Sequence, residues 1–174
     1  MHKMRPCLIQ TSRLQLHAIA ESDAADMCEI FTHPLVKQTY MLPDLESTEA
    51  QMKLFSAFQT LSLREDRFVY GIYLEDRVIG FVNDVEITET SIELGYVIHP
   101  AHHNCGFATE ALQACIQALH TMGFETVRTG AFQENPASIR VMEKSGMTRL
   151  AETEIIPYRG KDHLCVYFEK RKNA

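Results

Sequence analysis

The fold is decided by one stretch of the sequence, Ile92-Glu93-Leu94-Gly95-Tyr96-Val97-Ile98, and the turn that follows it, His102-His103-Asn104-Cys105-Gly106-Phe107-Ala108-Thr109-Glu110. The first part predicts a strand, and the second is a short polar turn that leads into a helix. Such a turn exposes backbone N–H groups at the positive end of the helix dipole, where phosphates bind readily. Gly106 leaves room for a phosphate, and Ala108 keeps the first helical turn slim. Taken alone, the segment also fits an ordinary strand-to-helix turn. A nucleotide P-loop is excluded because no Gly-Lys-Ser/Thr follows.

The chain after this turn alternates between helices and strands. Apolar residues at helical spacing predict a long helix from Gly106 to Met122, which Gly123 ends as a C-cap. A second helix is expected from Pro136 to Lys144, with Asn135 as its N-cap and Gly146 at its end. Around these helices we expect three strands, Glu125–Phe132, Met147–Ile156 and His163–Phe168.

The chain before the turn predicts two helices and an antiparallel meander. Ser22 is expected to cap a helix that runs to Phe31 and is ended by Pro34, and residues 34–46 are expected to form a polar loop. A second helix opens at Ser47. The expected strands are Thr11–Ala18, Arg67–Leu74, Arg77–Glu86 and Ser91–Ile98. The resulting order is β-α-α-β-β-β-α-β-α-β-β, a mixed α/β sheet in a single domain spanning residues 1–174.

Composition narrows the function classes. The 174 residues carry a formal net charge of −6, which argues against nucleic acid as a partner and mildly favours a cationic or amine substrate. No apolar run approaches the roughly 18 residues of a membrane span, and residues 1–6 lack the apolar run of a secretory signal, so we expect a cytoplasmic protein. The five widely spaced cysteines predict free thiols, and the histidines at 99, 102 and 103 lack the partners of a metal site.

Several motifs together resemble the GNAT superfamily of N-acetyltransferases, and within it the ribosomal-protein N-acetyltransferases of the RimJ/RimL-like branch. The motifs are Thr11-x-Arg13-Leu14-x-Leu16, Arg77-Val78-Ile79-Gly80-Phe81, Glu93-Leu94-Gly95-Tyr96-Val97-Ile98, Gly106-Phe107-Ala108-Thr109-Glu110-Ala111 and Asn135-x-x-Ser138-x-x-Val141-Met142-Glu143-Lys144-x-Gly146-Met147. They extend over almost the whole chain, and their order is more specific than any one of them.

The resemblance implies that the fourth strand and the strand after the long helix splay apart, with acetyl-CoA in the gap between them. The backbone of Val97 and Ile98 would pair with the pantetheine arm, and Asn135 would contact the cofactor from the opposite wall. The pyrophosphate would be held at the turn by His103, Asn104, Cys105, Gly106, Phe107, Ala108 and Thr109. Relatives are monomers or dimers, and their acceptors include protein N-termini.

Two positions depart from the pattern of the family. His103 stands where relatives usually have Gln or Arg, which removes one side-chain contact to the cofactor but leaves the main-chain amides. Met142 stands where many relatives have the tyrosine that protonates the departing thiolate. Relatives of this branch often have a serine at the position of Ser138 and are thought to use it instead.

Acetyl transfer to an amine needs a base for the ammonium and a proton for the sulfur. Glu93 is the candidate base, because strand alternation puts it on the face of Gly95 and Val97; an exposed strand glutamate is the alternative. Ser138 is the candidate proton donor, and a local helix cap is its alternative. The sequence thus predicts an N-acetyltransferase for a primary amine, without a metal. A non-catalytic acyl-CoA-binding module and an unrelated α/β interaction domain stay as alternatives.

Overall fold

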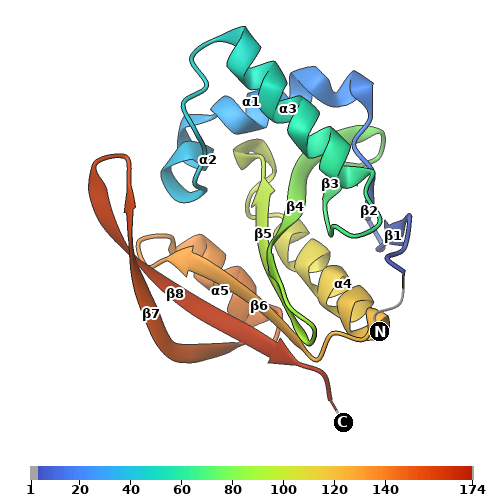
Figure 1. The fold of residues 1–174 in the computed structure, drawn as a ribbon, viewed down its shortest axis with the longest axis vertical. Coiled ribbons are helices and arrows are strands. Elements are labelled where there is room, and N and C mark those ends of the chain that lie inside the picture. Colours follow the sequence, from blue (N-terminus) through green and yellow to red (C-terminus); the bar gives the residue numbers. More distant parts are fainter. Residues whose placement is uncertain (1–3, 174) are drawn as a thin grey trace.

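The computed structural model describes residues 4–173, in which all the strands join one eight-stranded sheet (Figure 1). Residues 1–3, which belong to the stretch expected not to be a secretory signal, and residue 174 lie outside the described residues. The strands are β1 (Ile9–Gln10), β2 (Leu14–His17), β3 (Tyr70–Leu74), β4 (Arg77–Ile87), β5 (Ser91–Ile98), β6 (Thr126–Phe132), β7 (Thr148–Tyr158) and β8 (Lys161–Arg171). The helices are α1 (Ala24–Thr32), α2 (Pro34–Thr39), α3 (Thr48–Ser62), α4 (Phe107–Met122) and α5 (Pro136–Lys144), with 3-10 turns η1 (Glu21–Asp23) and η2 (Pro100–His102).

The sheet has the strand order β1-β2-β3-β4-β5-β6-β8-β7. All its neighbouring strands run antiparallel except β5 and β6, which are parallel. A parallel pair needs a crossover connection, and α4 provides it between β5 and β6. The expected mixed sheet, antiparallel early and crossed by helices late, is confirmed.

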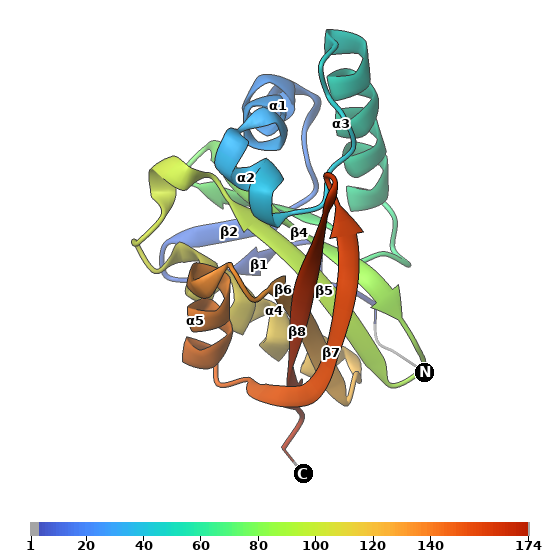
Figure 2. The ribbon, with the colours of Figure 1, turned by 90° about the vertical axis from the view of Figure 1, so that its left-hand side faces the viewer.

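Helices cover both faces of the sheet (Figures 1 and 2). The apolar stripe of α4, which includes Leu112, Ile116 and Leu119, packs against the apolar side chains of β2 to β6 in the largest core cluster. The opposite face carries α1 and α3, whose Phe31 and Phe55 pack with Phe81 of β4. No helix within residues 4–173 combines the length and the apolarity needed to cross a membrane.

Local signals set most helix ends where they were expected. Asn135 caps α5 by accepting a hydrogen bond from the Ser138 N–H, and Ser47 caps α3 in the same way. Gly123 ends α4 in the left-handed conformation, with a φ of 112°, which glycine adopts without steric cost.

Three expectations about the first half of the chain were wrong. Residues 34–46 are not all loop, because Pro34 begins α2 with its fixed φ while the His33 ring accepts a hydrogen bond from the Leu35 N–H. Ser22 is not the cap of α1, since Asp23 occupies that position. The two-residue strand β1, absent from the expected order, forms because Ile9 and Gln10 pair with Leu16 and Gln15 of β2.

Gly80 on β4 lets the backbone of β5 come unusually close. A methyl group built on its Cα would lie 2.1 Å from the carbonyl oxygen of Val97 and 3.0 Å from a methyl group of Ile98. A backbone oxygen within a sheet has little freedom to move aside, so only glycine fits at this point of the β4–β5 pair.

We expect Gly80→Ala to lower the free energy of unfolding by about 3 kcal/mol, the upper end of ordinary overpacking costs. Urea unfolding followed by circular dichroism measures the loss. Gly160→Ala is the matched control, because its added methyl group meets nothing within 4 Å. The control is expected to cost only about 1 kcal/mol, for a left-handed backbone. Equal losses in both variants would show that β5 can yield here.

Candidate active site

The parallel ladder between β5 and β6 stops halfway along both strands. Residues Ser91–Leu94 pair with Thr126–Thr129, and no pair follows. Beyond that point β5 stays paired with β4 as far as Ile98, and β6 stays paired with β8 as far as Phe132. The two strands therefore diverge after Leu94 and Thr129, which confirms the expected splay.

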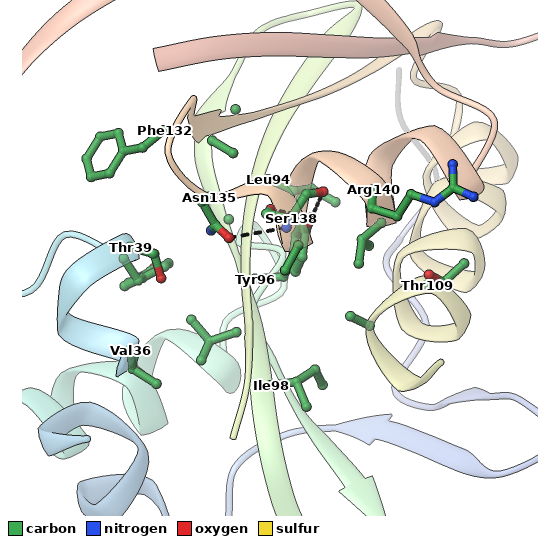
Figure 3. A pocket seen from close by; sticks show the side chains of 18 of the residues that line it. Val36, Thr39, Leu94, Tyr96, Ile98, Thr109, Phe132, Asn135, Ser138 and Arg140 are labelled. Carbon is green, nitrogen blue, oxygen red and sulfur yellow. Dashed lines mark hydrogen bonds between the residues drawn. The ribbon is translucent and has the colours of Figure 1, made fainter. Parts of the chain in front are cut away.

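A cavity of about 860 Å³ occupies the region where the strands diverge. Its walls come from the open ends of β5 and β6, the start of α4, one face of α5, and α2 with the β7–β8 hairpin (Figure 3). The cavity is large enough for a molecule of cofactor size. Its concave, partly apolar shape is typical of small-molecule sites.

The start of α4 presents a row of backbone N–H groups to this cavity. Gly106 is the N-cap, with a φ of 81°, and its carbonyl accepts the first helical bond, from the Glu110 N–H at 3.0 Å. Helix geometry leaves the N–H groups of Phe107, Ala108 and Thr109 without a partner inside the helix. Within the described chain, no protein group accepts a hydrogen bond from any N–H of residues 104–109. The turn is thus free to bind an anion through its main chain.

Arg13, in the bend just before β2, supports the start of α4. Its Nε donates to Glu110 Oε1 at 2.9 Å, and its guanidinium lies 4.4 Å from the centre of the Phe107 ring. Thr11 Oγ1 donates to the same carboxylate at 2.6 Å. Burial disfavours the charge on Glu110, but these hydrogen bonds outweigh it, and the pKa of Glu110 lies below its ordinary value. Arg13 and Glu110 thus form an ion pair that holds the start of α4 in place beside the open amides.

The sequence pattern predicted no site role for Arg13, although Arg13 belongs to the motif Thr11-x-Arg13-Leu14-x-Leu16. A methyl group added to Gly106 would lie 3.3 Å from Arg13 Nη2, which shows how close the guanidinium comes to the turn. Arg13 and Gly106 are more than ninety residues apart in the sequence. They come close only because β2 packs against α4.

The expected cofactor residues of the turn divide into those that line the cavity and those that do not. Asn104, Gly106, Phe107, Ala108 and Thr109 all line it. His103 also lines it, but its ring donates through Nε2 to the Ile98 carbonyl at 2.7 Å and so ties the turn to β5. The Cys105 side chain is exposed and does not line the cavity, and its Sγ contacts the His103 carbonyl at 3.3 Å.

The other expected residues meet across the cavity. Val97 and Ile98 line it from β5, and Asn135 lines it from the cap of α5. Ser138 Oγ lies 2.8 Å from the phenol oxygen of Tyr96, as Figure 3 shows. Met142 is fully buried in the main core and does not reach the cavity, so this position takes no part in the wall.

Ser138 does not serve as the helix cap that the sequence left open as an alternative. The cap is the Asn135 side chain, whose Oδ1 accepts from the Ser138 N–H at 3.3 Å. Within residues 4–173 the Ser138 hydroxyl contacts only the Tyr96 phenol by hydrogen bonding. The hydroxyl is therefore available at the cavity wall.

Charges of opposite sign line the cavity in different places. The cations Arg140 and Lys144 lie on α5, and Figure 3 shows Arg140 on the same side as Thr109 of α4. The carboxylates come from the sheet: Glu86 and Glu93 are direct partners on β4 and β5, and Glu154 lies on β7. The helix end thus suits an anion and the sheet end suits a cation.

Glu93 lies where several charges act on it. Burial raises the pKa of Glu93, the Arg128 guanidinium opposes this from 3.5 Å, and the neighbouring carboxylates of Glu86, Glu152 and Glu154 add to the rise. A carboxylate with a raised pKa is a stronger base than an ordinary one. Glu93 therefore has the position and the basicity to accept a proton from a group in the cavity.

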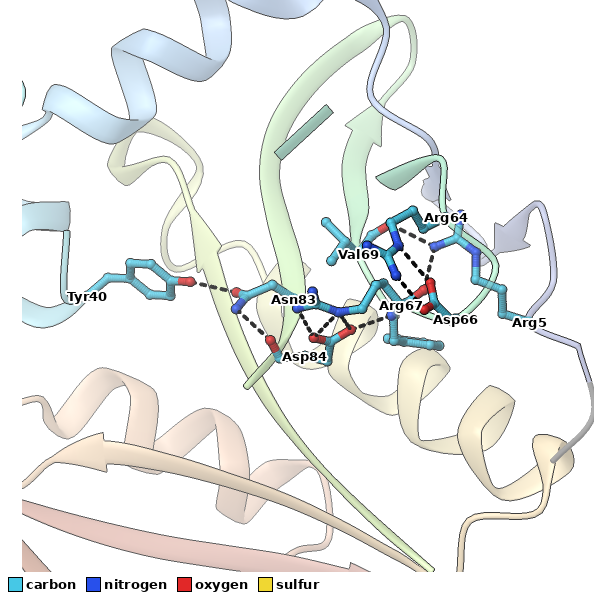
Figure 4. A network of polar contacts seen from close by, with 9 residues as sticks. Arg5, Tyr40, Arg64, Asp66, Arg67, Val69, Asn83 and Asp84 are labelled. Carbon is cyan, nitrogen blue, oxygen red and sulfur yellow. Dashed lines mark hydrogen bonds and ion pairs between the residues drawn. The ribbon is translucent and has the colours of Figure 1, made fainter. Parts of the chain in front are cut away.

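Hydrogen bonds join distant segments of the chain beside the sheet end of the cavity. Tyr40, just after α2, donates to Asn83 Oδ1 on β4 at 2.6 Å, and Figure 4 shows this bond beside the Arg67–Asp84 ion pair. Tyr158, at the tip of the β7–β8 hairpin, donates to the Lys37 carbonyl at 2.6 Å. This phenol thus links the hairpin to α2, and Arg159 adds a hydrogen bond of 3.4 Å to the Leu42 carbonyl just after α2.

No group of three or more His, Cys, Asp or Glu side chains within residues 4–173 is arranged to hold a metal ion.

The split parallel pair and the amide-lined turn characterise one class of enzyme. The family model described as "Acetyltransferase (GNAT) domain" matches residues 13–148, and the chain belongs to this family. It is an acetyltransferase that uses acetyl-CoA as its acyl donor. The open amides, the glycine at the turn and the size of the cavity fit that donor.

Individual proteins resemble the chain over most of its length. The uncharacterized N-acetyltransferase YoaA of Bacillus subtilis is 26% identical over 147 residues, which cover 82% of this chain and 83% of YoaA. A GNAT-family acetyltransferase structure from Bacillus anthracis superposes with a TM-score of 0.80 at 22% identity, over 94% of this chain and 98% of that one. The structure of RimL, a ribosomal L7/L12 alpha-N-protein acetyltransferase in complex with coenzyme A, gives 0.82 at 18% identity, over 97% and 98%.

Proposed function

We propose that this enzyme acetylates the primary amine of a protein N-terminus by direct transfer from acetyl-CoA. The observation that carries the proposal is the single cavity that joins open backbone amides at one end to three carboxylates at the other. The diphosphate of the donor needs the first end, and a cationic amine is attracted by the second. Direct transfer requires both substrates to reach one point at the same time, and a continuous cavity allows this.

The cofactor residues of the proposal follow from the walls of the cavity. The N–H groups of residues 104–109 would hold the pyrophosphate, with Arg140 and Lys144 of the cavity wall adding positive charge nearby. Ile98, Val97 and Asn135 line the path that leads from this end toward the carboxylates.

The acceptor side favours a protein N-terminus over a very small amine. Leu35, Met41 and Val85 line the cavity there and are 51%, 52% and 61% exposed, an apolar rim that an extended peptide would cover. The structurally similar RimL is itself described as acting on ribosomal protein L7/L12. An α-amino group also has a pKa near 8, compared with about 10.4 for lysine, so less basicity is needed to deprotonate it.

In the proposed reaction Glu93 takes a proton from the ammonium group, directly or through water. The neutral amine then attacks the thioester carbonyl carbon, the carbon–sulfur bond breaks, and its electron pair passes to sulfur. Ser138, whose hydroxyl is held at the cavity wall, donates a hydrogen bond or its proton to that sulfur.

The test combines binding with turnover. Isothermal calorimetry measures acetyl-CoA binding, and a free-thiol assay then follows turnover with N-terminal peptides, polyamines and aminoglycosides as acceptors. We expect micromolar to submillimolar binding and thiol release that is fastest with a peptide. Binding without release above background in any acceptor would favour the non-catalytic acyl-CoA-binding module. Release with small amines alone would replace the protein acceptor with a small-molecule one.

Gly106→Ala is expected to weaken acetyl-CoA binding about tenfold, equal to about 1.4 kcal/mol. The added methyl group meets Arg13 Nη2 at 3.3 Å and disfavours the left-handed φ of 81° that aims the amides. Calorimetry on the folded variant measures the change. Gly160→Ala is the control, since Gly160 has a similar φ of 73° in a hairpin turn with open space around it. The same loss of affinity in both variants would contradict a role for the turn.

Glu93→Gln is expected to lower kcat/KM about a hundredfold, within the usual contribution of a general base. In the wild type, kcat/KM should fall as the pH drops through the raised pKa of Glu93, because protonation removes the base. This acidic limb should therefore lie above the ordinary glutamate pKa of about 4.3 and disappear in Glu93→Gln.

Glu152→Gln provides the matched control for the pH profile. Glu152 pairs with Arg128 at 2.9 Å and helps to raise the pKa of Glu93, but it does not line the cavity. Its replacement removes a nearby negative charge and frees Arg128 to pair with Glu93. The acidic limb should then move to lower pH while the maximal rate is kept. If the acidic limb keeps its position in both Glu93→Gln and Glu152→Gln, the base is a group other than Glu93.

A further inference from the structure

We infer that Tyr96 is a positioning residue for acyl transfer, which it serves by directing the hydroxyl of Ser138 into the cavity. The inference rests on the proposed function and adds a residue to it. Tyr96 lies on the part of β5 that diverges from β6, and Ser138 lies in the first turn of α5, so the contact joins the two walls of the cavity (Figure 3).

The serine is held at two points. Its backbone N–H donates to Asn135 Oδ1 at 3.3 Å, which fixes the helical turn, and its Oγ lies 2.8 Å from the Tyr96 phenol oxygen. The same phenol oxygen lies 3.4 Å from the Ser138 carbonyl. The hydroxyl contact is the shorter and stronger of the two.

The direction of this bond decides what the serine can do. A phenol has one hydrogen, and a serine hydroxyl has one hydrogen and two acceptor sites. When the phenol donates to Oγ, the hydrogen of the serine is left to point at a group in the cavity. With no phenol present, the serine rotor has no partner within the described chain and is free to turn to any staggered position.

The position of the phenol is itself well determined. The Tyr96 ring packs between β4 and α4, where it contacts a small apolar gap shared with Val82, Ile98, Ala108 and Leu112. Burial raises the pKa of Tyr96 to about 12, and the bond with Ser138 only partly offsets this. The phenol therefore keeps its proton at the pH where amines are acetylated, which suits a donor that orients a neighbour and does not itself give up its proton.

The transfer step balances without any further reactant. The amine nitrogen forms a bond to the carbonyl carbon and loses one proton, and the carbon–sulfur bond breaks with its electron pair going to sulfur. Sulfur gains one proton through the Ser138 hydroxyl, which is reprotonated by way of cavity water from the proton that the amine lost. When the hydrogen of the Ser138 hydroxyl already points at the sulfur, the hydroxyl does not have to rotate before the proton moves. Tyr96 holds the hydroxyl in that orientation.

The experiment is a double-mutant cycle on the full chain with Tyr96→Phe, Ser138→Ala and both together. Acetyl-CoA binding and turnover of the wild type are measured first. A wild type that shows neither would overturn the proposed function itself, and not only the role of Tyr96. We expect Tyr96→Phe to lower kcat about tenfold, a part of the full proton-donor contribution, with acetyl-CoA affinity within about twofold of wild type. In the Ser138→Ala background the same substitution should change kcat little, because its target is gone.

Two further variants separate positioning from packing. Tyr70→Phe is the control, since Tyr70 is a buried tyrosine that donates to the Pro6 carbonyl at 2.6 Å and lies outside the cavity. It should leave kcat unchanged. Replacement of Tyr96 by 3-fluorotyrosine keeps the donor and the shape. It should retain most of the wild-type rate and move any alkaline loss of kcat to lower pH, a test that holds even if Tyr96→Phe fails to fold.

An unchanged kcat in Tyr96→Phe would overturn the inference. The inference would also be overturned if the loss of kcat in the double variant equalled the product of the two single losses. Tyr96 would then act independently of the serine. A loss of rate in Tyr70→Phe as large as in Tyr96→Phe would assign the effect to general packing.

Discussion

The end of hydrogen bonding between β5 and β6 is the constraint on which the rest of the structure depends. Past Leu94 and Thr129, the facing edges of two interior strands have no strand partner, although buried backbone groups usually need one. The split persists because each strand is held on its outer side, β5 by β4 and β6 by β8, and because α4 spans the connection between them. The sheet thereby gains an opening in its middle, which a ligand with its own polar groups can fill.

Much of the fold could be predicted because its signals are local. The cap at Asn135, the stop at Gly123 and the strand Ser91–Ile98 each depend on a few adjacent residues, and each lies where expected. The failures have a physical reason as well. Pro34 both ends one helix and begins the next, and the sequence pattern indicated only the first of these roles. A strand as short as β1 has no periodicity of its own and exists only through its partner.

The candidate site divides in the same way. The turn around Gly106 could be recognised because its amides, its glycine and its helix are consecutive in the chain. Arg13, Glu154 and the Tyr96–Ser138 contact could not, because each of these depends on which distant strand or helix folds against the turn or the gap. Strand alternation predicted that Glu93 faces the gap, and Glu93 lines the cavity; burial is the main cause of its raised pKa, and the carboxylates that add to the rise come from β4 and β7 and have no signature in its own segment.

The hydrogen bond from Tyr158 to the Lys37 carbonyl bears on how such an enzyme changes over evolution. The donor half of the cavity is encoded almost continuously between β5 and α5, so most substitutions there disturb several contacts at once. The opposite half includes α2 and a hairpin more than one hundred residues away, which Tyr158 and Arg159 link to α2 and the residues just after it. Insertions or exchanges in these two segments can therefore reshape that half of the cavity while the amides at the start of α4 stay in place.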